Sequence, residues 1–126
     1  KSMTEVGIVI VSHSKWIAQG LVDLISEVAK DVVLTYVGGT EDGGIGTSFE
    51  QVQTVVEANK AEKILAFFDL GSARMNLELV ADFSDKDIII NNVPIVEGAY
   101  TAAALLQAGA DLASIQEQLK ELEIKK

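Results

Sequence analysis

The chain contains no cysteine, one proline and one histidine among its 126 residues. Without cysteine there is no disulfide framework, no thiolate nucleophile and no thiolate metal site. No apolar run approaches the roughly 20 residues that cross a bilayer. No basic start followed by an apolar segment marks the chain for secretion. From these absences we expect a cytoplasmic protein with no membrane partner.

Basic residues are also scarce, because 10 Lys and Arg stand against 19 Asp and Glu and leave a formal net charge of -9. This charge argues against a nucleic-acid partner, since binding to the phosphate backbone depends on clustered Lys and Arg. It also repels free anions at long range, so any phosphate site has to be built from local groups. An acidic surface favours a basic protein partner instead.

The length suits one compact domain with its own hydrophobic core, which we place at residues 3–126. Lys1 and Ser2 precede Met3 and are expected to be a remnant of expression. Four short apolar runs rich in β-branched residues predict strands that are buried on both faces of a parallel sheet. These runs are residues 6–12, 32–37, 63–69 and 87–93.

Helical patterns lie between the predicted strands. After the first strand, one apolar stripe predicts the inward face of a helix, and its members are Ile17, Leu21, Leu24, Ile25 and Val28. The four later helices are predicted from residues that are typical of helix ends. They are expected to start at Ser48, Ser72, about Glu97 and Asp111. The third is expected to run to about Phe83 with Ala73, Leu77 and Val80 inward, and Gly109 is expected to end the fourth in a left-handed conformation.

The alternation of strands and helices predicts an α/β fold, a three-layer sandwich with a mainly parallel four-stranded sheet of order 2-1-3-4 and helices on both faces. In that order the first and third strands are neighbours and flank the switch point, where ligands bind beyond the carboxyl ends of the strands. His13 follows the first strand and Asp69 ends the third. We therefore expect the two side chains to face each other across a crevice.

A histidine beside a carboxylate can act as a nucleophile. Neutral imidazole attacks well near pH 7, and a carboxylate that binds one ring N–H leaves the lone pair of the other nitrogen exposed. We assign His13 as the nucleophile and Asp69 as the group that orients its ring. The pair also resembles two members of a serine triad, but Ser12 and Ser14 flank the histidine too closely in sequence to favour that geometry.

Two glycine-containing segments, "GGTEDGGIGTS" at 38–48 and "DLGSARMN" at 69–76, follow the second and third strands. Their backbone N–H groups, hydroxyls and helix N-termini can bind an anion. The candidate phosphoryl-binding residues are Ser14, Gly39, Thr40, Gly71, Ser72 and Ala73. The segments lack the lysine of a Walker loop and the Gly-x-Gly-x-x-Gly spacing of a dinucleotide site. We expect no cofactor and no metal ion.

Four ordered stretches carry a family resemblance: "IVIVSHS" at 8–14, "GIGTS" at 44–48, "DLGSA" at 69–73 and "PIVEGAY" at 94–100. At these stretches the sequence resembles the phosphotransferase subunits of bacterial dihydroxyacetone kinase. These subunits are the DhaM type of the mannose-type EIIA family in the phosphoenolpyruvate phosphotransferase system. The likeness extends over nearly the whole chain.

The resemblance implies that His13 is transiently phosphorylated by the phosphocarrier protein HPr, supplied in trans. The phosphoryl group would then pass to ADP held on the DhaL subunit, which acts with DhaK. A homodimer is also implied, and Met75 with Leu79 could mark its face. Trp16 could form part of an apolar docking rim.

Two alternatives stay open. One is a sugar-transport EIIA domain that hands the phosphoryl group to an EIIB partner, and the other is a non-catalytic, flavodoxin-like module that binds anions.

Overall fold

Four parallel strands form the central sheet in the computed structural model, which describes residues 6–126. They are β1 (Val6–Ser12), β2 (Leu34–Gly38), β3 (Lys63–Phe68) and β4 (Asp87–Asn91), in the order β2-β1-β3-β4. The predicted strand order is therefore confirmed. Lys1 and Ser2, expected to be a remnant of expression, lie outside the described residues.

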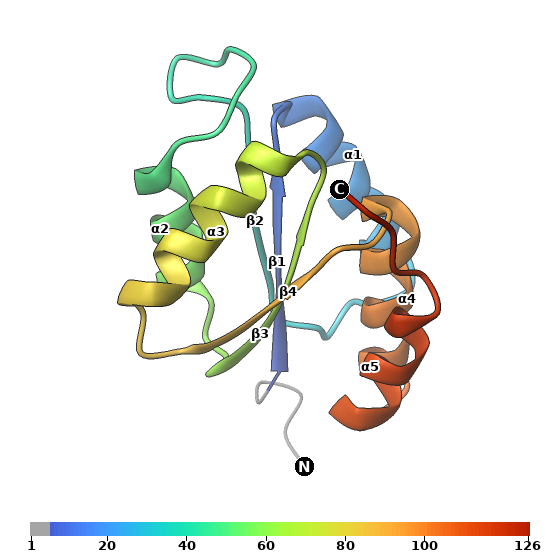
Figure 1. Cartoon of the computed structure of the whole chain (residues 1–126). Helices are drawn as coiled ribbons and strands as arrows, with labels where there is room; N and C mark the ends of the chain where they lie inside the picture. Colours follow the sequence, from blue (N-terminus) through green and yellow to red (C-terminus); the bar gives the residue numbers. More distant parts are fainter. Residues whose placement is uncertain (1–5) are drawn as a thin grey trace.

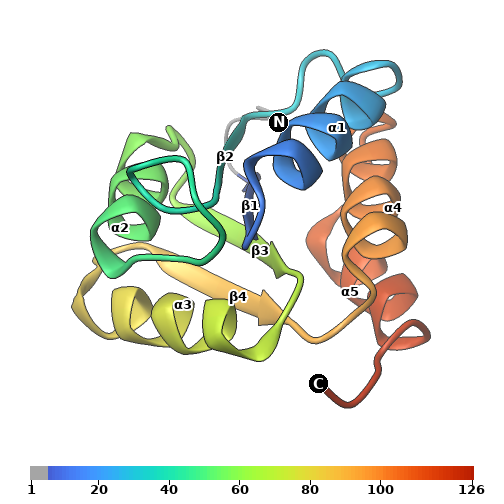
Figure 2. The ribbon, with the colours of Figure 1, turned by 90° about the horizontal axis from the view of Figure 1, so that it is seen from above.

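Helices cover both faces of the sheet and make three layers (Figures 1 and 2). Helices α2 (Phe49–Ala58) and α3 (Gly71–Phe83) pack on one face. Helices α1 (Lys15–Ser26), α4 (Ile95–Gln107) and α5 (Leu112–Lys120) pack on the other. The predicted sandwich is confirmed.

Alternate residues of the strands supply the two halves of the core. In β1, Ile8 and Ile10 face α1, α4 and α5, whereas Val9 and Val11 face α2 and α3, and all four are fully buried. Because a strand covered on both faces has no solvent-exposed side, its sequence is continuously apolar rather than alternating.

The inward face of α1 differs from the predicted stripe. Leu21 and Ile25 are buried as expected, but Ile17, Leu24 and Val28 are 49%, 47% and 38% exposed. The buried stripe of α1 instead runs through Ala18, Leu21 and Ile25, and Ala29, just beyond the helix, is also buried. Both stripes have helical spacing, and the small Ala18 fits where α1 lies close to the sheet, so counting only large apolar residues shifted the predicted face.

Most of the predicted helix ends are confirmed, with one correction. Ser48 accepts from the backbone of Gln51 and Asp111 accepts from that of Ser114, while Gly109 has a φ of +87°. Helix α3, however, has Leu70 at its N-cap with no side-chain hydrogen bond. Ser72 lies inside the first turn of α3, so its hydroxyl is available for another partner.

Within residues 6–126, no helix combines the length and the apolarity required to span a membrane.

Asn59 is a buried polar residue that ties three segments together. Its side-chain amide donates to the carbonyl oxygen of Ile8 at 3.0 Å and to the hydroxyl of Thr35 at 3.2 Å, and its Oδ1 accepts from the backbone N–H of Ala61 at 3.0 Å. The side chain is 1% exposed. It therefore fixes β1, β2 and the chain entering β3 relative to one another.

Substitution Asn59→Ala is expected to lower the free energy of unfolding by about 2–4 kcal/mol, because it leaves several buried polar groups unpaired at roughly 1–3 kcal/mol each. Urea denaturation followed by circular dichroism measures the loss. The exposed neighbour serves as a control, since Lys60→Ala should stay within about 0.5 kcal/mol of the original protein. Equal stability of the two variants would contradict this assignment.

Candidate functional site

The site lies where β1 and β3 end side by side at the carboxyl edge of the sheet. Val11 pairs with Phe68 in the parallel register, so Ser12 and His13 leave β1 next to the point where Asp69 leaves β3. The side chain of His13 meets that of Asp69 with Nδ1 2.8 Å from Oδ1. The predicted approach of His13 and Asp69 across the switch point is confirmed.

Asp69 accepts hydrogen bonds on both carboxylate oxygens. Its Oδ2 accepts from the Ser12 hydroxyl at 2.8 Å and from the His13 backbone N–H at 2.9 Å. Its Oδ1 accepts from the Leu70 backbone N–H at 2.7 Å as well as facing the His13 ring. Burial raises the pKa of Asp69, but these hydrogen bonds outweigh burial and lower it below the ordinary value.

The two ring nitrogens of His13 have different partners. An ionised carboxylate only accepts, so Nδ1 carries the proton that is donated to Asp69. The other nitrogen, Nε2, lies 2.5 Å from Oγ of Ser72. In the neutral ring it holds a lone pair, and the Ser72 hydroxyl donates to it. The His13 and Asp69 side chains are 15% and 13% exposed, so the ring is held at the surface rather than in the interior.

Ser72, His13 and Asp69 therefore line up in the order of a hydrolytic triad. We did not expect this arrangement from the sequence, where only Ser12 and Ser14 were considered as the third member. The two classes of chemistry use different nucleophiles, which are the Ser72 hydroxyl for hydrolysis and the His13 imidazole for group transfer.

The glycine-rich segment 38–48 lies beside the site, but its predicted donors already have hydrogen-bond partners in the protein. The N–H of Gly39 donates to the Ser12 carbonyl at 3.1 Å, and that of Thr40 donates to the Gly44 carbonyl at 3.0 Å. The Thr40 hydroxyl donates to Asp42 at 2.5 Å. Gly39 and Thr40 thus cannot donate to an anion without breaking these bonds, and their expected role as phosphoryl donors is not supported by this geometry.

The same segment instead holds the backbone of the histidine. The N–H of Gly46 donates to the carbonyl oxygen of His13 at 2.8 Å. Ser14, predicted to bind the phosphoryl group, is the N-cap of α1 and accepts from the N–H groups of Trp16 at 3.2 Å and Ile17 at 3.4 Å. Its hydroxyl is therefore engaged as an acceptor in the helix cap, and its proton alone can reach a ligand.

The first turn of α3 faces open space beside the histidine. A Cβ built at Gly71 would meet no heavy atom within 4 Å. Ala73 is fully buried and its N–H donates to the Leu70 carbonyl at 3.0 Å. Of the three predicted residues in this turn, Gly71 and Ser72 thus face the site, whereas Ala73 anchors the helix to the core.

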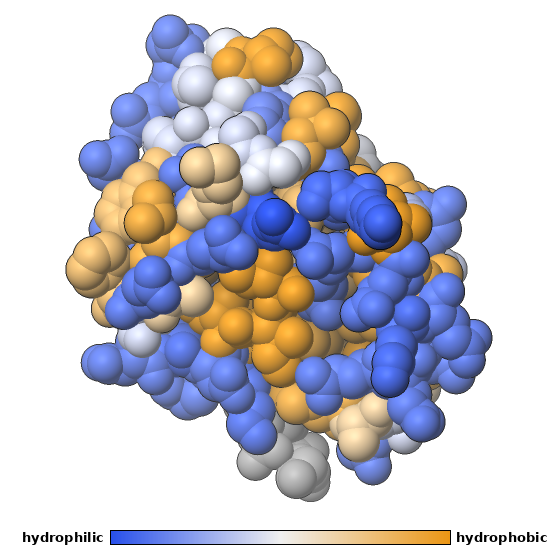
Figure 3. Space-filling view, in the orientation of Figure 1, coloured by the Kyte–Doolittle hydropathy of each residue, from blue (hydrophilic) through white to orange (hydrophobic). Residues whose placement is uncertain are grey.

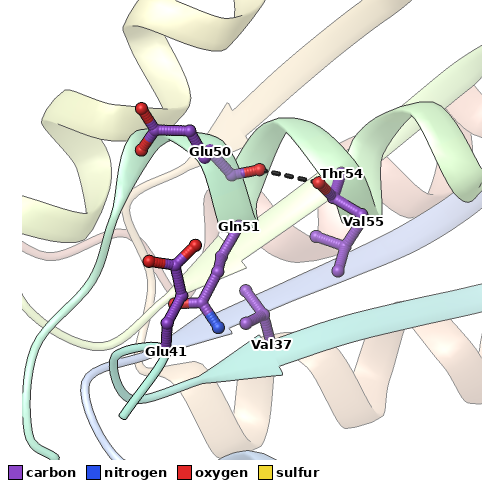
Figure 4. A pocket seen from close by; sticks show the side chains of 6 residues that line it. All are labelled: Val37, Glu41, Glu50, Gln51, Thr54 and Val55. Carbon is purple, nitrogen blue, oxygen red and sulfur yellow. Dashed lines mark hydrogen bonds between the residues drawn. The ribbon is translucent and has the colours of Figure 1, made fainter.

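A separate hollow lies between β2 and α2 (Figure 4). Its lining includes none of the predicted site residues and consists of Val37, Glu41, Glu50, Gln51, Thr54 and Val55. The Thr54 hydroxyl donates to the Glu50 carbonyl at 2.8 Å. Two carboxylates make this hollow unsuitable for a phosphoryl group.

The sequence interpretation missed Ser12 and Gly46 as site residues. Ser12 is 1% exposed, and its hydroxyl donates to the carboxylate of Asp69 that also binds the His13 ring. A polar residue that ends a continuously apolar strand is a signal that could have identified it. Gly46 carried no such signal, because its role depends on how the 38–48 segment folds back onto β1.

Fold and site together define an open parallel α/β protein with an oriented imidazole at its switch point. The family model described as PTS system fructose IIA component, EIIA-man, matches residues 7–116. The chain therefore belongs to the EIIA-man family, and within it to the group of DhaM subunits to which the curated relatives belong.

Two of these relatives match over almost their full length. The phosphotransferase subunit DhaM of the PTS-dependent dihydroxyacetone kinase of Lactococcus lactis subsp. lactis is 59% identical over 120 residues, or 95% of this chain and 98% of the relative. The phosphoryl donor subunit DhaM of the PEP-dependent dihydroxyacetone kinase 1 of Listeria innocua is 52% identical over 119 residues, or 94% and 96%. A crystal structure of a protein of unknown function superposes with a TM-score of 0.83 at 29% identity, covering 96% of this chain and 97% of that one.

The hydrogen bonds to Asp69 predict how its contribution to stability depends on pH. Because the folded pKa lies below the unfolded value, the stabilisation is present above about pH 4 and is lost as the pH falls through the folded pKa. Asp69→Asn should therefore unfold at lower urea concentration than the original protein at pH 7. This difference should shrink as the pH is lowered from about 4.

The exposed Asp85→Asn is the matched control and should leave the urea midpoint at pH 7 nearly unchanged. A difference between Asp69→Asn and the original protein that persists undiminished in acid would show that the ionised carboxylate does not stabilise the fold.

Proposed function

We propose that this chain is the phosphoryl-carrier subunit of a PEP-dependent dihydroxyacetone kinase and acts in the cytoplasm. His13 accepts a phosphoryl group from phospho-HPr and passes it to ADP on the DhaL subunit, which acts with DhaK. One observation carries the proposal: the Asp69 carboxylate binds Nδ1 of His13, so that Nε2 is directed away from the carboxylate. The names of the relatives, a phosphotransferase subunit and a phosphoryl donor subunit of dihydroxyacetone kinases, support a role in phosphoryl transfer.

In the proposed reaction the lone pair on Nε2 attacks phosphorus in line with the leaving nitrogen of the donor histidine. The new P–Nε2 bond forms as the P–N bond to the donor breaks, and the donor imidazole keeps that electron pair. Transfer of this kind requires positioning and charge stabilisation more than covalent help. Asp69 positions the ring and stabilises the positive charge that develops on it.

The Ser72 hydroxyl occupies the place where the phosphoryl group must arrive. We propose that it turns from Nε2 to donate to a phosphoryl oxygen, together with the N–H groups of Gly71 and Ser72 in the first turn of α3. These groups have no partner within the helix, and the helix dipole adds partial positive charge at the same place. The open space beside Gly71 leaves room for the transfer.

Exposed apolar side chains surround the histidine and suit a visiting protein. Trp16 is 75%, Ile45 79% and Leu70 60% exposed. Trp16 lies in the first turn of α1, shortly after His13. Ile45 precedes Gly46, whose N–H donates to the His13 carbonyl, and Leu70 follows Asp69. We propose that this docking rim, defined as Trp16, Ile45 and Leu70, receives HPr and DhaL in turn, since both must reach one imidazole.

Phosphorylation of the histidine is the decisive measurement. Incubation with phosphoenolpyruvate, enzyme I and HPr should add one phosphoryl mass to the peptide that contains His13. His13→Ala should abolish the label, and Asp69→Asn should slow labelling by roughly tenfold or more because control of the tautomer is lost. Ser72→Ala is the matched test of the triad and should still be labelled. Labelling that requires Ser72 but not His13 would point to hydroxyl chemistry and overturn the carrier proposal.

The acceptor is identified by chasing the labelled protein. Addition of DhaL with bound ADP should yield ATP and return the histidine to its unphosphorylated form, whereas a mannose-type EIIB protein should take up little phosphoryl group. The reverse pattern would favour the sugar-transport alternative. A protein that is never labelled would favour the anion-binding module.

We also propose that the chain forms a homodimer through β4 and α3. Strand β4 is an edge strand, and its Ile88, Ile89 and Ile90 are only partly buried. Apolar surface runs across the face where β4 lies (Figure 3). On the adjoining α3, Met75 and Leu79 are 63% and 48% exposed at helical spacing. A second copy would cover both the apolar area and the unpaired strand edge.

The double substitution Met75→Glu with Leu79→Glu should convert the dimer to a monomer in sedimentation equilibrium, because it places four carboxylates at a two-fold interface. Both positions are exposed, so the fold should persist. Leu24→Glu on the opposite layer, 47% exposed, should leave the dimer intact. A protein that is already monomeric before substitution would refute the interface.

A further inference from the structure

The segment after α5 returns to the carboxyl edge of the sheet (Figures 1 and 2). It is fastened there by the N–H of Ile124, which donates to the Asn92 carbonyl at 2.9 Å. The guanidinium of Arg74 on α3 donates to the carbonyl of Lys126 at 3.3 Å and to the side chain of Asn92 at 3.5 Å. The segment is thus held from both α3 and the β4–α4 connection.

Lys126 bridges the end of β3 and the connection between β4 and α4. Its ammonium donates to the carbonyl of Phe68 at 2.7 Å and to that of Val93 at 2.6 Å. It also lies 4.2 Å from the centroid of the Phe68 ring. Two carbonyl oxygens and an aromatic face are partners suited to a cation.

These contacts place a positive charge next to the site. Phe68 is the residue directly before Asp69, so the ammonium is bound to the peptide group that leads into the orienting carboxylate. Burial lowers the pKa of Lys126, and the negative charge of Asp69 opposes this effect. Lys15, at the start of α1, has its ammonium 5.1 Å from the centroid of the exposed Trp16 ring.

We infer that Lys126 is a positioning residue for the phosphoryl carrier. It fixes the end of β3 that presents Asp69 and compensates the charge that builds up when a phosphoryl group joins His13 beside that carboxylate. This inference depends on the proposed function. The phosphorylated state carries more negative charge than the resting state, so a fixed nearby cation stabilises it selectively.

The test measures the equilibrium between HPr and this protein. Lys126→Met removes the charge and keeps an unbranched side chain, and the ratio of phosphorylated to unphosphorylated protein at a fixed ratio of phospho-HPr to HPr should fall by roughly three- to tenfold. Lys125→Met is the matched control, because it makes the same change in charge at the exposed neighbouring position. Its equilibrium should equal that of the original protein.

Lys126→Arg separates charge from structure, since it restores the cation and can donate to both carbonyls. It should return the equilibrium to within about twofold of the original protein. Circular dichroism establishes that each variant is folded at the assay temperature, so a shift in equilibrium reports on the folded molecule. An unchanged equilibrium for Lys126→Met, or an equal fall for Lys125→Met, would overturn the inference.

The two proposals fail in different ways. If the original protein accepts a phosphoryl group while Lys126→Met behaves identically, only the role of Lys126 is lost. If the original protein accepts no phosphoryl group at all, the proposed function is wrong and this inference falls with it.

Discussion

The carboxylate of Asp69 is the interaction on which the site depends. It receives the Ser12 hydroxyl, the backbone N–H and ring of His13, and the N–H of Leu70. One side chain therefore joins the ends of β1 and β3, fixes the direction of the imidazole and sets where the chain turns into α3. Because its hydrogen bonds hold the pKa of Asp69 low, the carboxylate remains an acceptor, and the tautomer of His13 follows from that.

The sheet order makes this meeting possible. In the order β2-β1-β3-β4 the chain runs from β1 to the edge strand β2 and then crosses back over β1 to β3. Two residues 56 positions apart in sequence therefore leave adjacent strands at one edge of the sheet. The crossovers then bring the first turns of α1 and α3 to the same edge. The architecture brings N–H groups and one imidazole to the same edge of the sheet. There they offset the repulsion between the acidic net charge and a phosphoryl group.

Sequence patterns predicted the two central strands well, because burial on both faces leaves a continuous apolar run in β1 and β3. The edge strands β2 and β4 are only partly buried, so the expected burial on both faces was wrong for them, and they span 34–38 and 87–91 rather than 32–37 and 87–93. Sequence patterns also predicted that His13 and Asp69 approach, since that follows from strand order alone. They failed in α1, where two apolar stripes have the same helical spacing. The stripe that contains Ala18, rather than the one with Ile17 and Leu24, faces the core. The patterns placed Ser72 near the site but wrongly made it the cap of α3, because a serine near a helix start can cap the helix or face outward, and only the position of His13 decides. The contact of Lys126 with β3 could not be predicted, since nothing in the sequence "EIKK" indicates it.

The donors around the histidine explain how an acidic chain can carry a phosphoryl group that must leave again. The N–H groups of Gly39 and Thr40 are already bonded to backbone carbonyls, and the Thr40 hydroxyl is bonded to Asp42, so few groups remain to hold an anion, and these lie mainly in the first turn of α3. A site lined by several lysines would bind the phosphoryl group too tightly to release it to a second protein. In the proposed mechanism a single oriented imidazole, the partial charge of the α3 N-terminus and the ammonium of Lys126 provide weaker stabilisation. A carrier requires such a balance, because donor and acceptor must exchange the group in nearly isoenergetic steps.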